Sequence, residues 1–570
     1  MRWAFEFKNS RGYRYLCLVH KQWIPGKGPR NVRQIYIGTA DTLYEKLHAG
    51  LGELSLRTYS FGLQAALLFA ARETGLLEAL EKVLPVPDKA AHTAAHLIFL
   101  QVLGRVDTPR SRRKMAAWYT DSALPLYWPV PAATDRALLS SLRLLYGTDR
   151  ENQDGEPILT RARVRKVEEI VLGKLLKKGL RLKYLLFDGT NFYTYHKGTR
   201  LFKRGRSKQK RFDLNLAGLG LVTAEEIPVL SEVVPGNQND VDTFPEAFDA
   251  LLKRLERLEV DTKELTLVFD RGVNSEPNFD EMLGAVHVIA ALDRQKARRL
   301  FQVPLNRFRE VAKDGALQPV HGHATCWQGY GHDWRVLVTY RKGTAEQQEV
   351  EWEATKKKVL ARVAEWGLGT SQKAVMRQLV KLIPQHYHGV FDYGVEKVEA
   401  TLKDGRKVPR FRPYCRVPAE TEATFRSSWG KTAIITDLKE EEASDSELVR
   451  GWVLRAEIED EFKWLKDRHV VSVKPVWVWH DAAVPGHVFL TVMGHLLLRY
   501  LQREVRDLGL SVKQLMETLE SLRVGVVSRG GDPGAGGRPE LVVERMNRLQ
   551  VELATRFKLL ELLPRAEAAA

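Results

Sequence analysis

The chain has 570 residues, of which 44% are hydrophobic and 28% are charged, as is ordinary for a soluble globular protein of several domains. Its formal net charge of +17 and pI near 9.5 favour a polyanionic partner, nucleic acid first, with ribosome-like or membrane-surface binding as the alternative. Three scattered cysteines exclude a disulfide framework, and the lack of a signal-peptide core or of roughly 18 consecutive uncharged apolar residues predicts a cytoplasmic protein.

Residues 1–50 are expected to form a small β-rich unit, because two strand-like stretches flank the turn-rich residues 25–29. The pattern becomes helical over 51–183, where basic clusters recur at 110–114 and 174–183. A basic helical region is what a DNA-end-binding domain would contain, although each cluster by itself is equally well a solvated face.

An ordered run of strands follows in residues 184–293. One buried strand ends on Asp188 and another, at 265–269, ends on Asp270; a hairpin and a helix lie between them, and a fifth strand follows at 286–292. With a later helix that carries an acid, this order predicts a ribonuclease-H-like α/β catalytic core. The strands that precede the two aspartates are neighbours in such a sheet, so their carboxylates are expected to converge.

The later helix is expected over 452–466, where good helix formers run without glycine or proline and apolar residues recur along one face. At about 100° per residue, the adjacent stripe carries Trp452, Arg455, Glu459 and Lys466. An isolated stripe of this kind is usually a surface ion-pair face. The two upstream aspartates favour the other interpretation, in which Glu459 is the third acid of a site.

This helix belongs to a second core segment at 441–522, separated from the first by a β-rich inserted subdomain at 294–440. The remaining residues, 523–570, are expected to hold a flexible linker over 528–537 and an amphipathic helix over 539–563.

Asp188, Asp270 and Glu459 are the predicted catalytic and metal-binding residues. Three carboxylates around one site require cations, and hard oxygen ligands suit Mg²⁺ or Mn²⁺. Two such ions, about 3.5–4 Å apart, would activate a water or a 3′-hydroxyl and stabilise the leaving oxygen.

At these positions the sequence resembles the DDE transposases of bacterial insertion sequences, in the IS-four-like superfamily. Arg455, Glu459 and Lys466 match the spacing of that family's Tyr-x2-Arg-x3-Glu-x6-Lys signature, with Trp452 in place of the tyrosine. An indole N–H can donate a hydrogen bond but cannot accept one. Further similar blocks are Gly205–Leu214, Gly236-Asn-Gln-Asn-Asp240, Asp270-Arg-Gly272 and Gly486–Leu490. The resemblance implies cut-and-paste chemistry, phosphate contacts by the signature's cations, and a homodimer acting on paired element ends in a prokaryotic nucleoid.

Residues 197–211 carry eight basic side chains and no acid. Charge alone predicts a segment that binds the DNA backbone with salt-dependent affinity, and a disordered basic loop is the alternative. The predicted DNA contacts are Trp452, Arg455, Lys466, Lys203, Arg204, Arg206, Lys208, Lys210 and Arg211.

Two weaker signals are rejected: His321, His323 and Cys326 lack a second pair at zinc spacing, and Gly430-Lys-Thr432 lacks the earlier glycine of a P-loop. The tryptophans of the insertion are expected to be core residues, and one of them could stack a flipped base. They are Trp327, Trp334, Trp352 and Trp366.

We therefore expect a metal-dependent DNA transposase that acts on double-stranded terminal inverted repeats and on target DNA. Two alternatives remain open from the sequence: a transposase-derived DNA-binding protein without catalysis, and a nuclease of the same fold that cuts without joining.

Overall fold

The computed structural model describes residues 2–10, 13–26, 28–39, 41–42, 54–84, 93–130, 133–146, 160–313, 318–478, 480–529 and 540–564. The chain divides into two compact units. One contains residues 1–69, 113–131 and 505–570, and the other contains residues 70–112 and 132–504. All the predicted site residues belong to the second unit.

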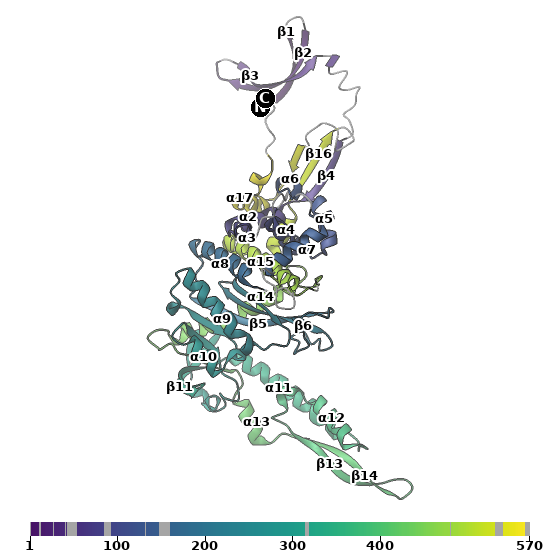
Figure 1. Cartoon of the computed structure of the whole chain (residues 1–570), viewed down its shortest axis with the longest axis vertical. Coiled ribbons are helices and arrows are strands. Elements are labelled where there is room, and N and C mark those ends of the chain that lie inside the picture. The colour runs from purple at the N-terminus through teal and green to yellow at the C-terminus, as the bar shows by residue number, and fades with distance from the viewer. Residues whose placement is uncertain are drawn as a thin grey trace, which may run out of the picture. The chain divides into compact units, whose positions relative to one another are not determined.

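The first unit contains two small sheets (Figure 1). Strands β1 (Arg2–Ser10), β2 (Tyr13–Ile24) and β3 (Gly28–Thr39) form an antiparallel sheet in the region expected to be β-rich. Strand β16 (Arg523–Arg529) pairs with β4 (Leu54–Ser60) on one side and β17 (Glu540–Val543) on the other. Its longer helices are α5 (Arg112–Thr120), α16 (Val512–Glu520) and α17 (Arg548–Arg556), and α2 (Gly62–Glu73) begins here.

Two expectations for this unit change. The region expected to be helical from residue 51 begins with strand β4. The C-terminal helix is shorter than expected, because the β-branched residues at 542–543 pair with β16 and the Asn547 cap starts the helix only at Arg548. Most of the linker expected over 528–537 lies outside the described residues.

The second unit is built on a nine-stranded sheet in the order β10-β11-β12-β15-β9-β8-β5-β6-β7. Its central strands β5 (Tyr184–Thr194), β8 (Thr266–Phe269) and β9 (His287–Ala291) run parallel. The hairpin of β6 (Asn215–Ala224) and β7 (Ile227–Pro235) continues the sheet antiparallel from β5. With α9 (Asp240–Arg257) and α10 (Glu276–Met282), the order of elements is the one expected, in a mixed α/β fold.

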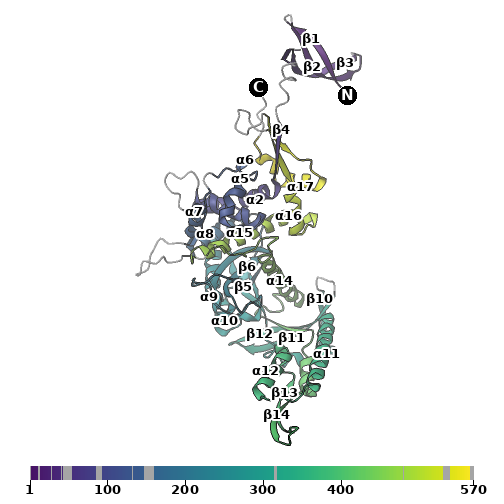
Figure 2. The same ribbon diagram turned by 90° about the vertical axis from the view of Figure 1, so that its right-hand side faces the viewer.

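The inserted segment is only partly separate from this sheet. Strands β10 (Arg309–Lys313), β11 (Pro319–Gly329), β12 (His332–Tyr340) and β15 (Lys431–Thr436) extend the sheet itself, because the apolar β15 pairs with β9 on one side and β12 on the other. The rest of the segment packs around the fully buried Trp352. It comprises α11 (Lys342–Ala364), α12 (Gln372–Leu382), the hairpin β13 (Asp392–Thr401) and β14 (Lys407–Arg416), and α13 (Ala419–Arg426). Figure 2 shows α12, β13 and β14 of this part below strands β11 and β12 of the sheet.

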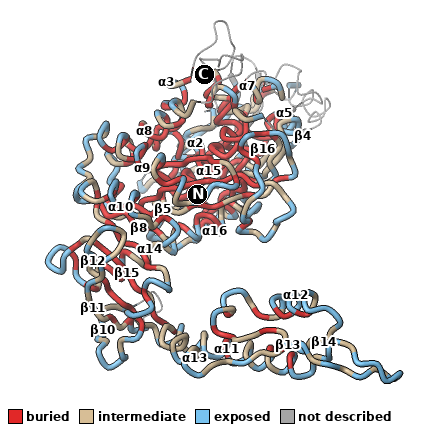
Figure 3. Tube along the Cα trace, turned by 60° about the horizontal axis from the view of Figure 1, so that its bottom comes forward, coloured by how far each residue is buried: buried red, intermediate tan, exposed pale blue. Residues whose placement is uncertain are grey.

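Helix α15 (Ala483–Glu504) is buried from Ala483 to Leu501, as Figure 3 shows by its colour. It packs against α4 (Ala94–Asp107) and α7 (Asp135–Tyr146), and α8 (Ala162–Lys177) packs against α3 (Leu76–Val83) and α7. No helix in the described ranges is both long enough and apolar enough to cross a membrane.

Helix α14 (Asp445–Trp464) carries the predicted third acid. It begins seven residues before the expected start at Trp452, because Ser444 and Glu447 form a reciprocal capping box. It ends at Trp464, so Lys466 lies just beyond the helix. Ile458 and Phe462 are buried, as their spacing predicts, and the helix contacts β5, β8 and β9.

Candidate active site

Asp188 and Asp270 lie at neighbouring positions of the sheet. Strands β5 and β8 are parallel, and Phe187 is in register with Phe269, so each aspartate follows a paired residue. The pKa of Asp188 is raised to about 6, chiefly by burial and also by the carboxylates of Asp240 and Asp270, while Lys208 and the Gly189 N–H lower it. The two aspartates therefore lie side by side as expected, but β5 does not end at Asp188: it continues to Thr194, paired with β6, and only its pairing with β8 stops at Phe187.

Asp240, the first residue of α9, is a neighbour that the prediction of three acids missed. A Cβ atom at Gly189 would lie 2.0 Å from Asp240 Oδ1, and one at Gly272 would lie 3.4 Å from Oδ2. Asp240 thus packs against the backbone just after Asp188 and just after Asp270. In the sequence, Asp240 ends the Gly236-Asn-Gln-Asn-Asp240 block, which is similar to a block of the transposase family but was given no catalytic role.

Two lysines contact this group of carboxylates. Lys208 Nζ lies 3.7 Å from Asp188 Oδ1 and 3.9 Å from Asp240 Oδ2, and it donates a hydrogen bond to the Gly189 carbonyl. Lys466 Nζ donates to Thr190 Oγ1 at 2.5 Å. Burial lowers the pKa of Lys466 to about 8, helped by Lys208 and Lys474 and opposed by Asp188. The site therefore carries cations of its own beside its acids.

Glu459 lies on the exposed stripe of α14 and is held by Arg455. Arg455 donates a hydrogen bond to Glu459 Oε1 at 2.6 Å, and its guanidinium lies 4.8 Å from the centre of a Trp452 ring. Trp452, Arg455 and Glu459 lie on α14 as predicted, while Lys466 lies beyond the helix; the ion pair that Glu459 makes is with Arg455. The contact is an (i, i+4) ion pair, which the helix places on one face without any need for the aspartates.

In the described part of the chain, no three His, Cys, Asp or Glu side chains converge closely enough to hold a metal ion as they stand. The donor types nevertheless fit Mg²⁺ or Mn²⁺, because Asp188 and Asp240 already enclose a positive charge, that of Lys208. Ligation by Asp188, Asp270 and Glu459 together stays a prediction.

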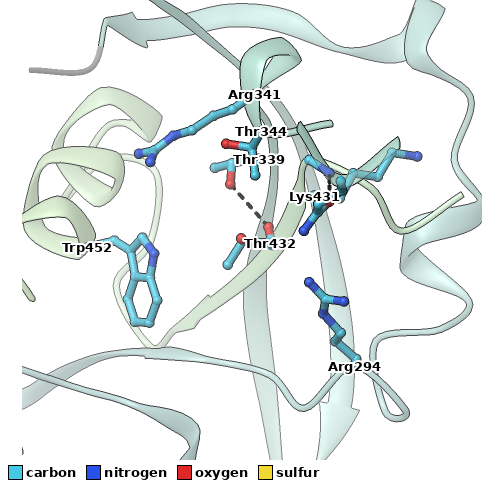
Figure 4. A pocket seen from close by; sticks show the side chains of 9 residues that line it. Arg294, Thr339, Arg341, Thr344, Lys431, Thr432 and Trp452 are labelled. Atoms are coloured by element: carbon cyan, nitrogen blue, oxygen red, sulfur yellow. Dashed lines mark hydrogen bonds between the residues drawn. The ribbon is translucent and has the colours of Figure 1, made fainter. Parts of the chain in front are cut away.

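A cavity of about 150 Å³ lies beside Trp452. Figure 4 shows the Trp452 indole and the Arg294 guanidinium on either side of Thr432, with Arg341 nearby. Burial lowers the pKa of Arg294, and the charge of Arg271 lowers it further. A cavity with guanidinium groups, hydroxyls and an indole N–H is suited to an anion such as a phosphate.

The family model of the transposase DDE domain matches residues 181–472, just over half of the chain. The chain belongs to this family of DDE transposases. No curated protein matches it. Among solved structures it is similar to the piggyBac transposase in a synaptic complex with hairpin DNA, at 8% identity and a TM-score of 0.35, covering 80% of this chain and 78% of that one. At that level of likeness, the assignment rests on the family match alone.

The basic loop of this transposase, residues 197–211, lies wholly within the described residues. The surroundings of its six predicted DNA contacts differ. Lys208 faces Asp188, and Arg211 is paired with Asp213 at 2.8 Å and lies over the rings of Tyr193 and Tyr195. The other four are exposed: Lys203, Arg204, Arg206 and Lys210. Within the described residues, neither Arg206 nor Lys210 has a carboxylate within ion-pair distance.

Two of the four tryptophans singled out in the insertion are core residues. Trp334 and Trp352 are 1% and 0% exposed, and their indole N–H groups donate to the Gly329 carbonyl and to Glu422. Neither can stack an extrahelical base without unfolding its surroundings, whereas Trp327 and Trp366 are half-buried.

Proposed function

We propose that this chain is a transposase of the IS-four-like superfamily that cuts the ends of a DNA element and joins their 3′-hydroxyls to target DNA. The observation that carries the proposal is the pairing of β5 with β8, which puts Asp188 and Asp270 at neighbouring positions, with the Lys208 ammonium 3.7 Å from Asp188. The strand order β9-β8-β5-β6-β7, parallel in its first three strands, supports a ribonuclease-H-like core.

Asp188 and Asp270 would hold the divalent ions, and Glu459 would complete the second ion's shell after leaving Arg455. Bound Mg²⁺ or Mn²⁺ would supply a nucleophile at neutral pH and stabilise the leaving oxygen. Arg455, once released, and Lys466 would each hold a phosphate beside the cut, because Arg455 lies beside Glu459 and Lys466 bonds to Thr190 near Asp188. Trp452 would donate its indole N–H to a phosphate in the cavity that it lines.

Exposed Arg206 and Lys210 would bind the backbone of double-stranded DNA, both terminal inverted repeats and target. A homodimer in a prokaryotic nucleoid would hold the two ends together. The basic helical region at 51–183 is proposed to bind the ends.

The test uses the inverted repeats that flank the gene as DNA ends. Asp188→Ala, Asp270→Ala and Glu459→Ala should each abolish strand cleavage while binding to the ends persists, since the acids hold ions and do not contact sequence. Cleavage by all three variants above a metal-free control would contradict the assignment. Wild-type cleavage without strand transfer would favour the nuclease alternative, and no cleavage in Mg²⁺ or Mn²⁺ would favour the inactive DNA-binding protein.

A further inference from the structure

Asp240 has no part in the function proposed above, although it lies at the centre of the site. We propose that Asp240 is a fourth carboxylate of the cation site, and that the Lys208 ammonium holds the place of a divalent ion between Asp188 and Asp240 in the metal-free protein. The identity of the ion rests on the proposed function, whereas the arrangement of Asp240 and Lys208 does not.

The packing of Asp240 distinguishes it from an ordinary acid at a helix start. Acids in the first turn of a helix commonly interact with its dipole, and the exposed Asp242 in the same turn needs no other explanation. Asp240 instead approaches Gly189 and Gly272 so closely that a side chain at Gly189 would displace its carboxylate. These two glycines follow the two predicted metal ligands, so the backbone after each ligand leaves room for the same carboxylate.

The surroundings of Lys208 Nζ are those of a hard cation. Its three oxygen neighbours are Asp188 Oδ1 at 3.7 Å, Asp240 Oδ2 at 3.9 Å and the Gly189 carbonyl, which accepts its hydrogen bond. Carboxylate and carbonyl oxygens from separate elements are the ligands that oxygen-preferring divalent ions take. A lysine ammonium at this point offsets the repulsion between the two carboxylates while no ion is bound.

An incoming ion must therefore displace Lys208. The lysine belongs to the loop at 203–211, and its side chain is 45% exposed on a flexible stem. Once displaced, its charge is free to meet a DNA phosphate. Ion binding and DNA binding would then strengthen each other. The ion releases Lys208 to bind a phosphate, and a phosphate that binds Lys208 leaves the carboxylates open to the ion.

The first measurement is Mn²⁺ binding by the full-length, DNA-free protein, followed by the loss of the free-ion electron paramagnetic resonance signal. Asp240→Asn should weaken binding by about tenfold or more, as loss of a group in or beside a metal shell typically does. Asp242→Asn removes the same charge from the same helix turn and should change binding by less than about twofold, because its attraction acts through solvent.

The second measurement tests the role of Lys208. Lys208→Met should tighten Mn²⁺ binding at least about threefold, because a competing charge within 4 Å of two carboxylates is gone. Lys210→Met, two residues along the same loop and exposed, should leave Mn²⁺ binding unchanged. Melting curves in chelator establish that each variant is folded.

The outcomes separate this inference from the proposed function. If Asp188→Asn and Asp270→Asn lose Mn²⁺ binding while Asp240→Asn binds like wild type, the fourth carboxylate is wrong and the transposase site stands. Weaker Mn²⁺ binding by Lys208→Met would contradict the proposal that the ion displaces the Lys208 ammonium. If none of the three aspartate variants loses binding, the ion site of the proposed function fails together with this inference.

Discussion

Lys466 Nζ donates a hydrogen bond to Thr190 Oγ1 at 2.5 Å, which joins the segment just after α14 to the strand that carries Asp188. Thr190 is two residues beyond Asp188 in β5, so the two side chains point to the same face of the sheet. The link ties the end of the signature helix to the strand of the first acid without help from a metal ion.

Lys466→Ala should weaken the complex with cleaved DNA ends by roughly ten- to a hundredfold, the usual worth of about 1.5–3 kcal/mol for a charge-assisted hydrogen bond. Arg455→Ala should do the same. Because neither residue is a ligand, the Mg²⁺ midpoint for cleavage should not move. Binding and cleavage across a Mg²⁺ titration measure both effects. The matched control is Lys463→Ala, which removes an exposed lysine paired with Asp460 on the same helix. If all three variants bind and cleave DNA equally well, these residues form only a surface ion-pair face.

Trp452→Tyr should keep cleavage activity or improve it, because a phenol can both donate and accept where the indole only donates. Trp452→Phe retains a ring against Arg455 but has no donor, so it should lose phosphate binding in the adjacent cavity. Cleavage rates for the pair, measured with the same DNA ends, separate the hydrogen bond from the stacking. Wild-type rates for Trp452→Phe would show that the indole N–H contacts no phosphate.

Within the basic loop, Arg206→Ala and Lys210→Ala should each lower the slope of log affinity against log salt by roughly one, as one lost phosphate contact does. Arg211→Ala should lower it less, because Asp213 already neutralises that guanidinium. Binding isotherms from low to high salt on unrelated DNA sequences measure the slopes. A larger loss of slope for Arg211→Ala than for Arg206→Ala would contradict the expectation that Arg211, paired with Asp213, contributes less to phosphate binding.

Asp188→Asn should stabilise the protein in chelator while abolishing cleavage, because it removes a buried carboxylate that faces other carboxylates. With the folded pKa raised from 3.8 to about 6, the ionised group costs stability above pH 6, and this cost disappears below about pH 4. The gain should be about 1–3 kcal/mol at pH 8, measured by denaturant unfolding. Asp242→Asn should show no comparable gain, and added Mg²⁺ should narrow the difference by stabilising the wild type.

Arg499→Met should destabilise the second unit by up to about 3–5 kcal/mol, because it removes the only cation bonded to the buried Glu461 of α14 within the described residues and leaves it with the His495 ring as its partner. Glu461 is 0% exposed and is bound by Arg499 and His495 of α15. Arg503→Met, one turn further along α15, breaks a more exposed pair with Glu225 and should cost less than about 1 kcal/mol. Melting temperatures of the two variants provide the comparison, and similar values would mean that the buried pair does not hold α14 in place.

The sequence by itself determined the order of elements around the site. The buried apolar strand residues that precede Asp188 and Asp270, and a helix with period-four apolar residues, have strong local patterns that do not depend on distant contacts. The stripe of Trp452, Arg455 and Glu459 followed from helical geometry, whereas Lys466 lies beyond the end of the helix at Trp464. The family match over residues 181–472 agrees with the DDE transposase assignment reached from those residues.

Only the tertiary structure decided which charges meet. Asp240 is one acid among many in the sequence, and its place against Gly189 and Gly272 depends on how the start of α9 packs against β5 and the segment after β8. Lys208 belongs to a loop whose basic residues look alike in sequence, yet it alone among them reaches Asp188. Ion pairs between distant segments depend on packing and carry no local periodicity, so a pattern in the sequence cannot reveal them.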